Sequence, residues 1–113
     1  MEISVARKAL EALRDDLERS IVVLQAEHPR ARGGGIEAGD AGANLTEADR
    51  CDAAVESVRG QRIEVMAALA RVEDGSYGKC VDCGQPVPDG RLEARPTTPR
   101  CVGCQSKRDR RRR

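Results

Sequence analysis

Aromatic residues are almost absent from this chain of 113 residues, which has no Trp, no Phe and a single Tyr. Such a composition cannot build an aromatic core, so Leu, Val, Ile and Ala must supply the buried surface. The length suffices for one small domain, whose core is thin enough to need the support of a bound metal.

Long apolar runs are also missing, both as a membrane span and as the apolar segment of a secretory signal. The sequence therefore predicts a soluble, cytoplasmic protein with no membrane partner and with reduced cysteines. It shows no Ser/His/Asp or Cys/His arrangement and no glycine-rich phosphate loop opening a helix, so we expect no enzymatic activity.

The charge is unevenly distributed, although the net charge is only +1. Residues 105–113 carry six Lys or Arg residues and one Asp, whereas the other residues hold 14 basic and 18 acidic side chains. The chain is thus an acidic body with a basic tail. Contact with nucleic acid is expected at most through this tail, which is otherwise a solvated end.

Four of the five cysteines form two Cys-x-x-Cys pairs separated by the seventeen residues 84–100: Cys80, Cys83, Cys101 and Cys104. This is the spacing of a four-cysteine zinc site. Gly84 follows Cys83 and Gly103 precedes Cys104, and we expect a sharp turn at each glycine. Four thiolates close the tetrahedral coordination of Zn²⁺, so one structural ion per chain is predicted. Two disulfides and a redox-active pair are the alternatives; the first needs an oxidising compartment and the second a thioredoxin-like βαβ pattern.

Apolar residues recur at steps of three and four in residues 3–27 and again in residues 47–73. Each stretch predicts an amphipathic helix with a heptad-like seam, so each helix can bury its seam only against the other. Cys51 falls on the second seam as a buried free thiol, and Arg62 takes one seam position with its charge reaching water. Two capping-box patterns, beginning at Asn44 and Thr46, compete for the start of the second helix.

The predicted fold is mainly α: an antiparallel two-helix coiled-coil hairpin followed by a small four-cysteine zinc finger and a short C-terminal helix or tail. The expected boundaries are 1–76 for the hairpin with its tip loop at 28–46, 77–105 for the zinc finger and 106–113 for the basic tail. The loop holds five glycines, and four prolines are expected to keep the segment between the cysteine pairs extended.

The cysteine-rich segment resembles the zinc-finger signature of the DksA/TraR family. The matching strings are YGKCVDCG and RLEARPTTPRCVGCQ, together with VEDG at 72–75. That resemblance implies a bacterial regulator of transcription without sequence-specific DNA binding. Its helical hairpin would enter the secondary channel of RNA polymerase while the zinc module stays outside. It also implies guanosine tetraphosphate as a ligand at the interface, and we expect a monomer.

Family members carry an Asp-x-x-Asp-x-Ala motif at the hairpin tip, and this chain has Glu37 and Asp40 at the corresponding acid spacing. Asp49 is a rival tip residue, which would otherwise serve as a helix cap. Two other functions remain open on the residues alone: a nucleic-acid-binding zinc protein that uses the Arg-rich tail, and a thiol-based redox or zinc sensor.

Overall fold

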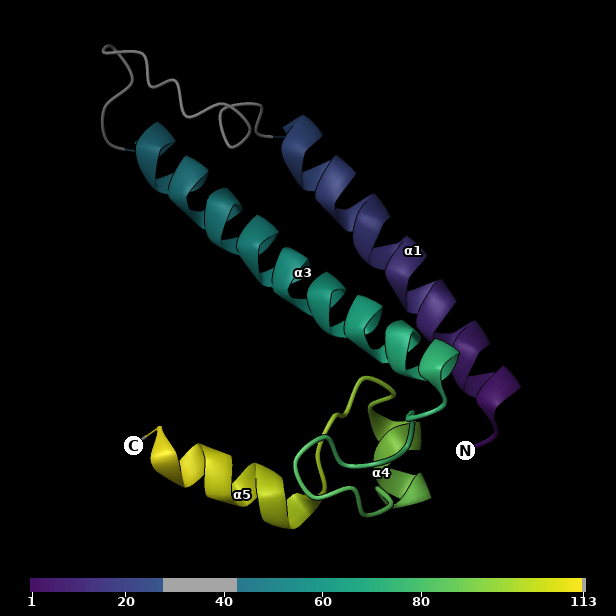
Figure 1. Ribbon diagram of the computed structural model, residues 1–113. Helices are drawn as coiled ribbons and strands as arrows, with labels where there is room; N and C mark the ends of the chain where they lie inside the picture. Colours follow the sequence, from purple (N-terminus) through teal and green to yellow (C-terminus); the bar gives the residue numbers. More distant parts are fainter. Residues whose placement is uncertain (28–42, 113) are drawn as a thin grey trace. The chain divides into compact units, whose positions relative to one another are not determined.

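The computed structural model describes residues 1–27 and 43–112, with the side chains of 1–27 and 49–112. The described residues form the α-helices α1 (Ile3–Glu27), α3 (Ala43–Asp74), α4 (Asp89–Ala94) and α5 (Val102–Arg111) (Figure 1). Within them there is no strand beyond an isolated antiparallel bridge between Lys79 and Pro86. The chain is mainly α, as predicted, and none of the described helices is long and apolar enough to cross a membrane.

The residues group into two compact units, and the boundary falls inside both long helices. Unit 1 comprises Met1–Leu13 and Glu64–Arg113, and unit 2 comprises Arg14–Ile63.

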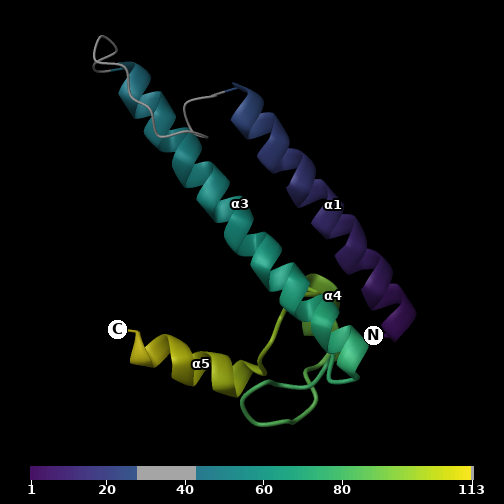
Figure 2. The same ribbon diagram turned by 45° about the horizontal axis from the view of Figure 1, so that its top comes forward.

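In unit 2, α1 and α3 run antiparallel, side by side in both views (Figures 1 and 2). The Cys51 thiol donates a hydrogen bond to the carbonyl oxygen of Leu24 at 3.3 Å, and Arg62 pairs with Glu18 at 3.0 Å. Cys51 is buried as predicted, with its thiol satisfied by the backbone of the partner helix. The Arg62–Glu18 pair is half exposed and therefore adds little stability.

In unit 1, the first turns of α1 pack against the last turns of α3, also antiparallel. Four buried side chains come from the predicted seams: Ala6, Leu10, Val65 and Val72. Ala68 is buried as well, whereas its neighbour Leu69, which was predicted on the seam, is only half-buried. Arg7 and Glu73 pair across the two helices at 3.0 Å. Ile3, predicted on the seam, is 43% exposed because it occupies the first residue of α1.

The two predicted capping boxes do not mark the start of α3, which begins at Ala43, four residues before the predicted start. Residues 43–46 of the expected tip loop are therefore helical, whereas the rest of that loop lies outside the described residues. Residues 43–46 contain no glycine or proline, so nothing in their composition opposes a helix that begins at Ala43. Asp49 consequently lies inside α3 and is not its cap.

The end of α3 is where the sequence predicts it, at Asp74 and Gly75. Gly75 has a φ of +83°, which glycine adopts without steric cost. The backbone N–H groups of Ser76 and Tyr77 both donate to the carbonyl oxygen of Arg71, at 3.0 and 3.1 Å. This αL ending satisfies a free helix carbonyl and turns the chain into the cysteine-rich segment.

Two valines test whether unit 1 depends on the seam. Val65→Ala removes a fully buried side chain, whereas Val22→Ala alters one that is 64% exposed. Both changes raise helix propensity equally, so their difference isolates burial. We expect Val65→Ala to lower the free energy of unfolding by about 2 kcal/mol more than Val22→Ala does, measured by urea denaturation with zinc present. Equal effects of the two changes on the free energy of unfolding would mean that burial of the seam does not stabilise unit 1.

Candidate metal centre

The first cysteine pair lies on a tight turn between Lys79 and Pro86. The backbone N–H of Cys80 donates to the carbonyl oxygen of Gln85 at 2.8 Å, and the N–H of Gly84 donates back to Cys80 at 2.9 Å. Gly84 has a φ of +75°, so the predicted need for glycine at this turn holds.

The second pair is presented differently, by the first turn of α5. Cys101 is the N-cap of this helix, and its sulfur accepts a hydrogen bond from the backbone N–H of Cys104 at 3.5 Å. Gly103 lies inside the helix without a positive φ, so the expected sharp turn there is wrong. The helix itself brings residues three apart onto one side, which makes a special backbone conformation unnecessary.

The segment between the pairs is not simply extended, as the prolines suggested, because it contains α4. Pro88 precedes the first helical residue, where a missing N–H costs nothing, and Pro96 follows soon after the end. α4 buries Leu92, and the N–H of Val81 donates to the carbonyl oxygen of Pro99 at 2.9 Å. These contacts return the second cysteine pair to the first.

All four sulfurs lie within 4.8 Å of one another. Zinc–sulfur bonds of about 2.3 Å in a tetrahedron place the sulfurs about 3.8 Å apart. The Sγ atoms of Cys83 and Cys101 are 3.9 Å apart. The sequence pattern and the geometry therefore agree on one tetrahedral, closed site for a zinc ion.

The protonation of these thiols shows why a cation suits the site. Burial opposes ionisation of Cys80, yet hydrogen bonds from the backbone N–H groups of Cys101, Cys83 and Asp82 lower its pKa to about 6. Hydrogen bonds with the sulfurs of Cys101, Cys80 and Cys83 raise the pKa of Cys104 to about 12.

One thiolate therefore forms easily beside thiols that resist ionisation. A divalent cation favours the ionised form of every cysteine in the site, because it binds thiolates and displaces the protons of the thiols. Acid accordingly competes with zinc for the sulfurs.

Side chains around the centre join it to the helices of unit 1. The Tyr77 hydroxyl donates to the carbonyl oxygen of Pro96 at 2.8 Å, and its ring is buried. Arg71 of α3 donates to the carbonyl oxygen of Thr97 at 3.4 Å. Burial lowers the pKa of Arg71.

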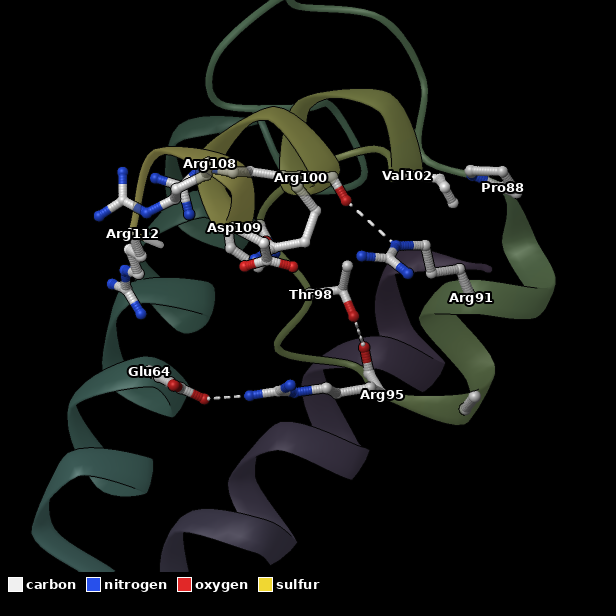
Figure 3. A pocket seen from close by; sticks show the side chains of 13 residues that line it. Glu64, Pro88, Arg91, Arg95, Thr98, Arg100, Val102, Arg108, Asp109 and Arg112 are labelled. Atoms are coloured by element: carbon white, nitrogen blue, oxygen red, sulfur yellow. Dashed lines mark hydrogen bonds and ion pairs between the residues drawn. The ribbon is translucent and has the colours of Figure 1, made fainter. Parts of the chain in front are cut away.

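A cleft of about 950 Å³ lies beside the metal centre, within unit 1 (Figure 3). Five arginines line it, against the acids Glu64 and Asp109: Arg91, Arg95, Arg100, Arg108 and Arg112. Arg95 pairs with Glu64 at 2.8 Å, and Arg91 donates to the carbonyl oxygen of Arg100 at 3.1 Å. Arg91 and Arg95 thus stabilise the zinc module through these contacts, and they also add positive charge to the cleft.

Sequence reasoning did not anticipate this cleft. The available signal was the four-residue spacing of Arg108 and Arg112, which puts both on one side of a helical turn.

The structure describes one of the three candidate tip acids. Asp49 is an exposed residue of α3 in unit 2. Glu37 and Asp40 lie outside the described residues.

Comparison with known proteins places the strongest likeness on the cysteine-rich segment. Residues 75–110 match the family described as the prokaryotic dksA/traR C4-type zinc finger. Over 46 residues, the chain is 54% identical to the RNA polymerase-binding transcription factor DksA of Caulobacter vibrioides. That alignment covers 41% of this chain and 32% of the relative, so the chain spans about a third of the Caulobacter protein.

A second relative aligns along nearly the whole chain. The RNA polymerase-binding transcription factor DksA of Salmonella typhimurium is 30% identical over 112 residues, covering 93% of this chain and 70% of the relative. The solved structure of transcription factor DksA2 from Pseudomonas aeruginosa has a TM-score of 0.83 at 24% identity, covering 97% of this chain and 84% of that one. The structural likeness confirms the fold, and the C4 finger with its four clustered sulfurs supports one structural zinc ion.

Cysteine substitutions separate the metal centre from the buried thiol. Cys83→Ser with Cys101→Ser removes one sulfur from each pair, whereas Cys51→Ser alters the cysteine of unit 2. We expect about one zinc per chain in the unmodified protein and in Cys51→Ser, and almost none in the double variant, because structural zinc contributes roughly 10 to 16 kcal/mol of apparent binding energy. Zinc analysis after dialysis under reducing conditions measures this. Stoichiometric zinc in the double variant would contradict the assignment.

Proposed function

The chain belongs to the DksA/TraR family, and from this premise we propose that it is a zinc-containing transcription regulator that binds RNA polymerase. The observation that carries the proposal is the alignment over 93% of the chain with a relative named as an RNA polymerase-binding transcription factor. At that coverage, the alignment takes in most of both long helices as well as the zinc finger. We propose Cys80, Cys83, Cys101 and Cys104 as the zinc ligands.

The proposed route of action is the secondary channel of the polymerase, the pore that admits nucleotides. Two packed helices measure only about 10 by 20 Å in cross-section, so such a pair enters a pore that excludes a globular domain. We assign residues 1–76 to this hairpin, 77–105 to the zinc finger and 106–113 to the basic tail. The protein would act as a monomer in the cytoplasm, modulating initiation.

The acids proposed to act in the channel are Glu37 and Asp40, with Asp49 as the rival. Carboxylates delivered near a Mg²⁺ site can perturb the metal, its ligands or the nearby nucleic acid. The position of Asp49 within α3 removes its expected role as a helix cap. Asp52 and Glu56 follow it at steps of three and four, and all three are exposed, so this part of α3 presents a row of acids.

Guanosine tetraphosphate at the interface with polymerase is part of the same proposal. Its phosphates need cationic partners, and unit 1 supplies them in the arginine-lined cleft.

Single neutral substitutions distinguish the tip acids. We expect Asp40→Asn to reduce the effect on transcription in vitro about tenfold while binding to core RNA polymerase stays within about threefold, because the acid acts after docking. Asp15→Asn, an exposed acid of α1, is the matched control and should change neither.

Two results would contradict the proposal at different levels. Loss of activity with Asp49→Asn but not with Asp40→Asn would move the tip to α3. Failure of the unmodified, zinc-loaded chain to bind core RNA polymerase would remove the proposed function itself.

A further inference from the structure

Helix α5 carries positive charge on two opposite sides. One side faces the arginine-lined cleft beside the metal centre, which is lined by Gln105, Arg108, Asp109 and Arg112. At 100° per residue, Lys107, Arg110 and Arg111 point about half a turn away from that side. These three exposed residues, here called the outer basic face, are not needed to line the cleft.

Little in unit 1 neutralises the outer basic face. Among the described residues, no ion pair involves Lys107, Arg110 or Arg111; Arg110 makes one long hydrogen bond of 3.4 Å to the carbonyl oxygen of Ser106. The neighbouring carboxylate of Asp109 accepts instead from Gln105 at 3.0 Å.

The helix dipole accounts for a cation near the C-terminus of α5, but not for three adjacent ones. Each cation there gains a fraction of a kcal/mol, about as much as like charges three or four residues apart lose. A bound polyanion would relieve this repulsion.

We propose that the outer basic face binds the phosphate backbone of duplex DNA without reading the base sequence. Arginine and lysine are the side chains that make such contacts, and three of them on one side of a helix follow a line of phosphates. The inference goes beyond the proposed function and does not depend on binding to polymerase.

Other polyanions fit α5 less well. A helix that binds membranes needs an apolar side, and the only large apolar side chain of α5 is Val102. Single-stranded nucleic acid is held by stacking on aromatic rings, and the one aromatic residue of the chain, Tyr77, is buried. Phosphates of a stacked duplex require neither feature.

The test measures binding of the zinc-loaded full chain to a fluorescent 20-base-pair DNA duplex over a series of salt concentrations. The variant Lys107→Gln/Arg110→Gln/Arg111→Gln is compared with Lys8→Gln/Arg50→Gln/Arg59→Gln. Both lose three exposed charges, so the comparison separates the face from net charge. Zinc content and helical circular dichroism verify that each variant is folded.

We expect the unmodified chain to bind with a strongly salt-dependent affinity. The outer-face variant should bind at least about tenfold more weakly at low salt. Its slope of log K against log salt should be smaller in magnitude by about 2 to 3, because each lost phosphate contact accounts for about 0.9. The control variant should stay within about threefold of the unmodified chain.

Four outcomes would overturn the proposal. They are no binding by the unmodified chain, equal weakening by the control, tighter binding to duplex RNA of the same sequence, and displacement by polyglutamate as effective as by unlabelled DNA at equal charge. The last outcome would assign the face to an acidic protein surface. Binding to core RNA polymerase, measured separately, shows whether the proposed function stands in each case.

Discussion

Four cysteine sulfurs lie within 4.8 Å of one another, and the repulsion that their thiolates would feel is the constraint that shapes the C-terminal part of unit 1. Without a cation, the pKa of Cys80 is lowered to about 6, whereas the pKa of Cys104 is raised to about 12. The apolar support there is slight, because its buried apolar side chains apart from cysteine are Tyr77, Val87 and Leu92. Metal binding must therefore supply much of the stability that a larger core would provide.

The zinc module is held against the helices of unit 1 more by fixed geometry than by strong electrostatics. The αL ending of α3 at Gly75 directs the chain toward the first cysteine turn, and Tyr77 fills the space beyond it. The Arg95–Glu64 ion pair is largely exposed and contributes little by itself. A zinc-organised turn and a buried tyrosine thus set where the arginine-lined cleft and α5 lie within this unit.

The sequence predicted the features that depend on local spacing. The residues of α1 are those that the apolar period indicated, and the four cysteines meet as their spacing required. Features that depend on competition between local signals were missed: α4 forms between prolines that flank it, and α3 continues through both capping-box patterns to Ala43. The pairing of Arg95 with Glu64 joins residues 31 apart, so no local pattern could reveal it.

Tyr77 makes the dependence of the module on zinc directly measurable, because it is the only aromatic residue and its hydroxyl donates to Pro96 of the module. The measurement is near-ultraviolet circular dichroism of the reduced protein during zinc removal by a chelator and restoration by one equivalent. The account predicts that the tyrosine signal is lost with the metal and recovered with it. An unchanged tyrosine signal in the metal-free protein would contradict it.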